Sequence, residues 1–365
     1  MIKNIFTLCT PDYINAVNAL SSSLKETEPN TTLFCYVFGN PAHQNLIANE
    51  NIRIIHIESL SLPEIRGKEF SHTPFEMCCL LKPVIAKYHL LNNECDFLLF
   101  LDSDTYTYSP FLTELSQTNA KILLSPHALY PETINRFEPF LRSGAFNAGL
   151  FAIKRHHEAF EFLNWWSAMV NFKCIQDPNN GLLLEQKWLD LAPSLFNEIE
   201  IIRDPGINTA YWNLCERVLS RKSNSILINQ KHPLKIFHFS GIIRERLSKY
   251  SDIKTEDRAD GKLLKQLADE YLSVMDDYSD TKYHYAHEKF DSGEQITPEM
   301  RKLVLFGLSK VTTPFSNFDE IQRELKKNRL KIQESLVISQ LQRLESYDRN
   351  LFFRILFRLY AKFFA

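Results

Sequence analysis

The chain carries no excess charge of one sign: its 365 residues include 42 Lys and Arg against 44 Asp and Glu, a formal net charge of −2. A basic field that attracts nucleic acid over the whole surface is therefore absent, and we expect no nucleic-acid partner. No apolar run approaches the roughly 20 residues that span a bilayer. The first residues are too weakly basic and apolar for a signal peptide, so we expect a cytoplasmic protein.

The seven cysteines are scattered and form no CxxC motif, which argues against a zinc ribbon or a disulfide framework and is typical of a reducing compartment. The sequence also has no GxGxxG and no GxxxxGK[ST], which argues against a dehydrogenase or a P-loop kinase. The remaining composition, 44% hydrophobic and 24% charged, is that of a globular chain. Its length predicts about two domains.

Short apolar strands alternate with helical stretches through about residue 245, which predicts an α/β fold. We expect strands at 2–9, 31–39, 51–57, 96–104, 145–153 and 236–241, and helices at 11–24, 76–91 and 156–170. After residue 250 the sequence becomes charged and rich in helix formers, at 251–282 and 319–350. We therefore expect a domain boundary near 245–255, followed by a helical appendage.

Two carboxylates, Asp102 and Asp104, follow the apolar strand DFLLFL. In open α/β sheets, ligands bind outside the carboxyl ends of the strands. Two carboxylates at that place can both reach one hard divalent cation, which in turn would neutralise phosphate oxygens. The alternative is a solvated turn after a strand.

His238 lies in the segment FHFSG, and Arg244 follows it. An imidazole can bind a metal, Gly241 allows a close backbone approach, and a guanidinium can hold a phosphate. A core histidine with satisfied hydrogen bonds is the ordinary alternative. Combined with Asp102 and Asp104, the mixed carboxylate and imidazole set suits Mn²⁺, with Mg²⁺ as a second choice.

Amide and carboxylate side chains that suit sugar hydroxyls occur at Asn147, Glu185 and Gln186, since each can donate or accept in a fixed plane. Trp212 follows a turn-like stretch at 203–208 and could form a platform for a sugar ring. The alternatives are a solvated helix face for Glu185 and an ordinary core position for Trp212.

These motifs occur in an order and spacing that resemble a known family. The chain resembles GT-A fold glycosyltransferases, in particular family 8, which includes bacterial lipopolysaccharide galactosyltransferases and glycogenin, and related uncharacterised bacterial proteins. The resemblance spans about residues 4–244 and is carried by FTLCTPDYINAVNALSSSL, LLKP, FLDSDTYTYSP, FNAGLFAI, EQKWLDLAPSLF, DPGINTAYWNL and FHFSG. It implies a Rossmann-like mixed sheet flanked by helices, with a C-terminal helical extension.

The resemblance also implies a site. Asp102, Asp104 and His238 would bind Mn²⁺, which bridges to the diphosphate of a nucleotide sugar with uridine as the expected base. The residues expected to contact this donor are Thr10, Asp12, Tyr13, Lys82, Ser103, Gly241 and Arg244, and those expected to act at the donor sugar are Asn147, Glu185 and Gln186. The chain departs from the family at Glu185, where Asp is usual, and at Arg244, where Lys is usual.

We therefore expect a metal-dependent hexosyltransferase that moves a sugar from a nucleotide diphosphate sugar to a glycan or lipid-linked acceptor. The resemblance implies retention of configuration, in the synthesis of a bacterial surface polysaccharide or lipopolysaccharide. Two other functions fit the same residues: a catalytically silent nucleotide-sugar-binding scaffold at the membrane, and a metal-dependent sugar-nucleotide phosphohydrolase.

The segment 347–365 combines basic and aromatic side chains. Arg354, Arg358 and Lys362 recur every four residues and would form one stripe on a helix. Such a helix would bind an anionic membrane from the cytoplasmic side, whereas a helix docked on its own domain or on a second copy is the alternative. The expected domains are a catalytic domain at 1–248, a helical extension at 249–340 and a basic amphipathic tail at 341–365.

Overall fold

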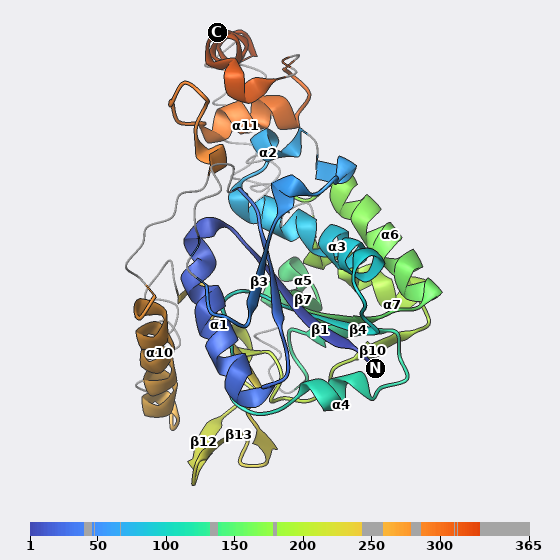
Figure 1. Cartoon of the computed structure of the whole chain (residues 1–365), viewed down its shortest axis with the longest axis vertical. Helices are drawn as coiled ribbons and strands as arrows, with labels where there is room; N and C mark the ends of the chain where they lie inside the picture. The colour runs from blue at the N-terminus through green and yellow to red at the C-terminus, as the bar shows by residue number, and fades with distance from the viewer. Residues whose placement is uncertain are drawn as a thin grey trace, which may run out of the picture. The chain divides into compact units, whose positions relative to one another are not determined.

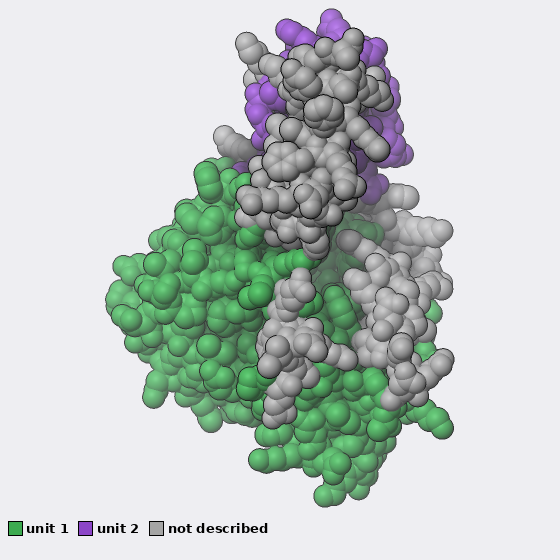
Figure 2. Space-filling model, turned by 180° about the vertical axis from the view of Figure 1, so that it is seen from behind, with its two compact units in different colours: residues 1–65, 74–286 green, residues 66–73, 287–365 purple. Residues whose placement is uncertain are grey.

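The computed structural model describes residues 1–39, 46, 48–65, 67–131, 138–177, 181–242, 258–278, 286–309, 311 and 313–328 (Figure 1). The chain divides into two compact units, distinguished in Figure 2: Met1–Ile65 with Pro74–Ala286, and Arg66–Thr73 with His287–Ala365. The domain boundaries expected at 248 and 340 lie outside the described residues and stay predictions, as does the tail at 341–365. Helix α10 (Gly261–Asp276), which we expected in the extension, lies in the first unit.

A seven-stranded sheet, in the order β10-β6-β7-β4-β1-β2-β3, forms the centre of the first unit. Strand β7 runs antiparallel to β4 and β6, while the other neighbouring pairs are parallel. The predicted α/β fold with a mixed sheet is therefore confirmed. The strands of this sheet are β1 (Lys3–Cys9), β2 (Leu33–Val37), β3 (Ile52–His56), β4 (Phe97–Leu101), β6 (Ile122–Pro126), β7 (Phe146–Lys154) and β10 (Ile199–Ile201).

Helices cover both faces of this sheet (Figure 1). Side chains alternate between the faces along each strand. In β1, Phe6 packs in the cluster that includes α3 and α6, whereas Ile5 packs in the cluster that includes α1 and α4. The described helices are α1 (Ile14–Thr27), α2 (Lys68–Ser71), α3 (Pro74–Asn92), α4 (Leu112–Ser116), α5 (Glu138–Ser143), α6 (His157–Phe172), α7 (Ala192–Leu195), α10 and α11 (Pro298–Leu305).

The central strand β4 has the sequence FLLFL, and all five side chains are buried. A strand covered on both faces favours such a continuous apolar run. Each fully buried Leu or Phe stabilises the fold by about 1.5–3 kcal/mol relative to an exposed position. The residues that follow β4 are therefore attached to a fully buried strand of the sheet.

Smaller sheets extend the first unit, and one of them shapes the candidate site. Strand β5 (Thr105–Thr107) begins directly after the turn that follows β4 and pairs antiparallel with β15 (Ile236–His238), with His238 opposite Thr105. On its other side β15 pairs with β11 (Thr209–Ala210). The other small sheets are β12 (Leu219–Lys222) with β13 (Ser225–Ile228) and β14 (His232–Pro233), and β8 (Gln176–Asp177) with β9 (Leu182–Leu183).

Helix α10 supports the end of β15. The ring of Tyr271 stacks on that of Phe239, with centroids 4.3 Å apart and planes 10° apart. Tyr271 is 1% exposed and belongs to an apolar cluster with Leu264, Leu267 and Phe239. The helix thereby packs behind the strand that carries His238.

The second unit has an apolar cluster of its own, centred on Phe70, Phe290 and Leu303. The guanidinium of Arg301, in α11, donates to the carbonyl oxygens of Phe70, His72 and His287 at 2.9, 2.8 and 2.6 Å. Residues 318–328 are helical, which agrees with the start of the helix expected at 319–350. None of the helices in the described ranges is long and apolar enough to cross a membrane.

All seven cysteines lie within the described ranges and are free thiols, as the sequence predicts. Five of them are buried. Burial raises the pKa of the Cys95 thiol to about 11, which disfavours the reactive thiolate.

Candidate metal centre

Three strands bring the predicted site residues to one edge of the main sheet. Strands β1 and β4 are parallel neighbours, so their carboxyl ends lie together, and the amino end of the antiparallel β7 meets them there. Asp102 and Asp104 follow β4, Thr10 follows β1, and Asn147 lies at the start of β7. This edge, beyond the strand ends, is where α/β proteins bind ligands.

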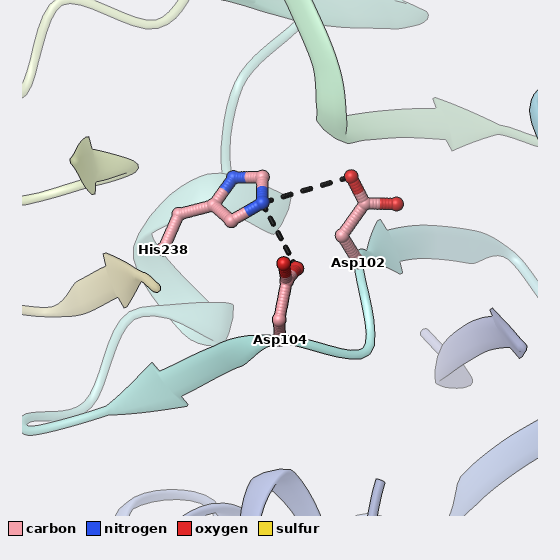
Figure 3. Close-up of side chains that lie close together, drawn as sticks. All are labelled: Asp102, Asp104 and His238. Atoms are coloured by element: carbon pink, nitrogen blue, oxygen red, sulfur yellow. Dashed lines mark ion pairs between the residues drawn. The ribbon is translucent and has the colours of Figure 1, made fainter. Parts of the chain in front are cut away.

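Asp102, Asp104 and His238 come together at this edge (Figure 3). His238 Nε2 lies 3.0 Å from Asp104 Oδ1 and 3.7 Å from Asp102 Oδ2. One oxygen or nitrogen atom of each side chain lies within 4.8 Å of the others. The grouping that the sequence predicted is therefore present as a candidate metal site.

Gly149 makes room for this cluster. A Cβ atom at Gly149 would lie 2.5 Å from His238 Cε1 and 2.7 Å from Asp102 Oδ2, distances that real contacts do not show. The glycine carbonyl also accepts a hydrogen bond of 2.8 Å from the Asp102 backbone N–H. The absent side chain thus lets β7 pass directly beside the candidate ligands.

The electrostatics of the cluster favour an ion pair between Asp104 and His238. Burial opposes the charge on both groups, but their mutual attraction outweighs it, so the pKa of Asp104 is lowered and that of His238 is raised. Burial raises the pKa of Asp102, against the opposing attraction of Lys82. In this state a proton on His238 compensates the carboxylates, and a divalent cation would replace it.

Lys82, in α3, lies between two carboxylates. Its Nζ is 3.0 Å from Asp102 Oδ1 and 2.9 Å from Glu185 Oε1, and it donates to the Ala148 carbonyl oxygen at 3.3 Å. Burial disfavours its charge, but the two carboxylates outweigh burial and raise the pKa of Lys82. Glu185 is 2% exposed, so its carboxylate serves an internal ion pair rather than the solvated helix face considered above.

Two of the predicted sugar-binding side chains are amides that lie close together. Asn147 Nδ2 is 3.5 Å from Gln186 Oε1, and Gln186 Nε2 donates to the Ser143 carbonyl oxygen at 2.8 Å. Asn147 Oδ1 accepts from the Gly149 backbone N–H at 3.1 Å. Asn147 and Gln186 are thus neighbours at the edge of the sheet.

Asn208 joins these amides to the metal cluster, a role that sequence reasoning missed. Its Nδ2 donates to Asn147 Oδ1 at 3.1 Å, and its Oδ1 lies 3.1 Å from His238 Nδ1. The sequence shows Asn208 only as the last residue of a turn-like stretch. Its side-chain contacts depend on the folded positions of β6, β7 and β15, so no local pattern indicates them.

The remaining predicted donor residues are placed as follows. Thr10 is buried, Asp12 is exposed and Tyr13 is half-buried, and the three lie just after β1. Ser103 is 8% exposed between the two candidate ligands. Gly241 follows β15 with a φ of 80°, a conformation that favours glycine. Arg244 lies outside the described residues.

Trp212 and His127 flank the cluster. The Trp212 ring lies edge-on to His238, with centroids 5.2 Å apart, and edge-on to His127 at 5.7 Å. His127 Nδ1 is 2.8 Å from the Gly144 carbonyl oxygen. Burial lowers the pKa of His127 to about 4, so this second histidine is neutral. Trp212 is half-buried, so it packs against the site and also retains exposed surface.

Fold and site together define an α/β protein with a candidate divalent-metal centre at the carboxyl edge of a mixed sheet. No family model matches the chain. Two uncharacterised proteins of Bacillus subtilis (strain 168) are similar in sequence. YfnF is 24% identical over 263 residues, which cover 70% of this chain and 86% of YfnF. YfnD is 23% identical over 247 residues, which cover 63% of this chain and 78% of YfnD.

Two solved structures are also similar. One is the galactosyltransferase LgtC in complex with donor and acceptor sugar analogs, with 16% identity, a TM-score of 0.42, and coverage of 76% of this chain and 97% of LgtC. The other is an active-site mutant of LgtC, with 16% identity, a TM-score of 0.38, and coverage of 65% and 87%.

Proposed function

We propose that this chain is a metal-dependent glycosyltransferase that moves a sugar from a nucleotide diphosphate sugar to a glycan or lipid-linked acceptor. The observation that carries the proposal is the cluster of Asp102, Asp104 and His238 at the carboxyl edge of the sheet. The segment after β1, which the sequence resemblance assigns to the nucleobase, begins at the same edge.

The donor atoms fit a divalent cation. Two carboxylates and one imidazole suit Mn²⁺, and Mg²⁺ is the second choice. Glycine at position 149 lets β7 pass close to them, where a Cβ atom would overlap His238 and Asp102. When bound, the cation would neutralise charge on the diphosphate of the donor and on the departing nucleotide diphosphate.

The protein's own groups prepare this site. The ammonium of Lys82 favours the charged form of Asp102, the form that binds a cation, and Glu185 holds Lys82 in place from the other side. Lys82 is almost fully buried, so we assign it to Asp102 rather than to the donor phosphates. The catalytic role expected of Glu185 stays a prediction.

Asn147 and Gln186 supply the amides that would orient the donor sugar. Their contact of 3.5 Å is long for a hydrogen bond, so exchanging it for a sugar hydroxyl costs little. Gly241 and Arg244 would then hold the diphosphate, as the resemblance implies. Uridine as the base, retention of configuration and a role in bacterial surface polysaccharide or lipopolysaccharide synthesis also rest on that resemblance. Attachment of segment 347–365 to an anionic membrane rests on its basic and aromatic sequence.

A thermal-shift screen of nucleoside diphosphates with and without Mn²⁺ tests the donor site. A ligand at 100 times its dissociation constant stabilises the folded state by about 2.7 kcal/mol. We expect uridine diphosphate to raise the melting temperature only when Mn²⁺ is present, and Asp104→Asn to abolish that increase. Asp269→Asn, in an exposed pair with Lys265, is the matched control.

A turnover assay with a nucleotide sugar, with and without an acceptor, separates the three candidate functions. Transfer of sugar to an acceptor supports the proposal, release of free sugar or phosphate without an acceptor supports a phosphohydrolase, and binding without turnover supports a scaffold. If no nucleotide stabilises the protein in the presence of Mn²⁺, the proposed donor site is wrong.

A further inference from the structure

His238 has two ring nitrogens with different neighbours. Nε2 faces Asp104 and Asp102 (Figure 3), whereas Nδ1 lies 3.1 Å from Asn208 Oδ1. A histidine can offer a lone pair to a cation at one nitrogen while the other nitrogen carries a proton. Which nitrogen is free depends on what the second one bonds.

The direction of the hydrogen bonds behind His238 is set by the backbone. The Gly149 N–H can only donate, and it donates to Asn147 at 3.1 Å, so the atom that receives it is the carbonyl oxygen Oδ1. Asn208 reaches that same oxygen at 3.1 Å and therefore does so with its Nδ2 amide hydrogens. The other side-chain atom of Asn208, which faces His238, must then be the acceptor Oδ1.

Asn208 is held firmly in this orientation. It is 0% exposed, and its Nδ2 also donates to Ser125 Oγ at 2.8 Å. Asn213 Nδ2 donates to the Asn208 backbone carbonyl oxygen at 3.0 Å. The backbone of Asn208 has a φ of 55°, a left-handed conformation that Asn adopts more readily than most residues. Side chain and backbone are thus both fixed.

We infer that Asn208 is a positioning residue that keeps the proton of His238 on Nδ1, so that the Nε2 lone pair serves a divalent cation. The direction of each hydrogen bond follows from the one before it, beginning with the Gly149 N–H and continuing through Asn147 and Asn208 to the His238 ring. The inference rests on the metal centre of the proposed function. It extends that proposal, because it assigns a residue that touches neither cation nor substrate.

Mn²⁺ titration of the full chain without nucleotide, with free Mn²⁺ measured by electron paramagnetic resonance, tests the inference. Glycine tolerates the backbone conformation of residue 208, so Asn208→Gly removes the side chain alone. We expect it to weaken Mn²⁺ binding by about 10–100-fold, the usual cost of losing a partner behind a metal ligand. Asn208→Asp keeps an acceptor for Nδ1–H and should retain most of the affinity.

Asn229→Gly is the matched control, because Asn229 also has a positive φ, 51°, and makes side-chain bonds to the backbone at Val218 and Glu216. It should bind Mn²⁺ like the unaltered protein. Equal Mn²⁺ affinity of Asn208→Gly and the unaltered protein would overturn the inference while leaving the metal site intact. Failure of the unaltered protein to bind Mn²⁺ would overturn the proposed function and the inference together.

A second measurement uses no metal and no variant of Asn208, so it does not depend on whether such a variant folds. In proton–nitrogen NMR spectra of the metal-free protein, the ring signals of His238 are identified by their loss in His238→Gln. At a pH at which the His238 ring carries a single proton, we expect that proton on Nδ1, where it exchanges slowly with solvent. A His238 ring without a proton on Nδ1 would overturn the inference.

Discussion

The two sides of the metal cluster are held by different kinds of interaction. Behind Asp102 lies a charged side, in which Lys82 pairs with Asp102 and Glu185. Behind His238 lies a neutral side, in which Asn208 and Asn147 are joined by hydrogen bonds. Ion pairs set the charge of a ligand but tolerate small shifts, whereas hydrogen bonds between amides set direction. One side thus controls ionisation, and the other controls orientation.

This difference predicts that the charged side is the more costly to damage. Lys82→Met leaves the buried carboxylate of Glu185 and the half-buried carboxylate of Asp102 without their cation, and we expect a loss of about 3–5 kcal/mol in unfolding free energy. Chemical denaturation measures this loss. Since a methionine and a neutral amide need no counter-charge, adding Glu185→Gln to Lys82→Met should restore part of it.

An exposed pair supplies the control for this prediction. Lys265→Met breaks the pair with Asp269 in α10, whose side chains are 64% and 49% exposed, and should change stability by less than about 1 kcal/mol. If Lys82→Met costs no more than Lys265→Met, the charged side is not the stabilising element described above.

Gly149 lies where the two sides meet. Replacing it by alanine should cost less stability than Lys82→Met but should weaken metal binding. In Gly149→Ala the new Cβ would overlap His238 Cε1 and Asp102 Oδ2, so both candidate ligands must move. Overpacking of this kind costs about 1–3 kcal/mol. We expect a folded protein with weakened Mn²⁺ binding, measured by calorimetry and circular dichroism. Unchanged Mn²⁺ affinity would show that the ligands can shift without loss.

Sequence and structure agree best where the signal is local. The expected strands at 96–104 and 145–153 correspond to β4 and β7, because an apolar run in a covered strand is visible in the sequence. Strands β6 and β10 of the main sheet were not predicted, although β6, with the sequence ILLSP, is also a buried run. β10 has only three residues, none of them fully buried, and so it shows no clear pattern.

The same distinction applies to the candidate site: residues with a local sequence signal were predicted, and contacts made only in the folded chain were not. Asp102, Asp104 and His238 were predicted as one cluster, since strand ends and residue chemistry indicate it. The pairing of Lys82 with Glu185 and the role of Asn208 were not predicted, because they arise where α3, β7 and β15 pack together. A buried lysine inside an apolar helix looks in sequence like any other lysine.

The smallest expected effect concerns pH and the second histidine near the site, His127. The rings of His127 and His238 both contact the Trp212 ring. Burial lowers the pKa of His127 to about 4, whereas an unfolded histidine titrates near pH 6.5. Between these values the unfolded state binds a proton that the folded state does not. Folding stability therefore falls as the pH drops from about 6.5 towards 4.

Replacing His127 by a residue that does not titrate removes its share of this fall. His127→Gln keeps an amide that can donate to the Gly144 carbonyl oxygen, the partner of Nδ1 at 2.8 Å. We expect the difference in stability between pH 7 and pH 5 to shrink by about 1–2 kcal/mol in this variant. Urea denaturation at the two pH values measures it. An unchanged difference would mean that burial in the folded state does not lower the pKa of His127.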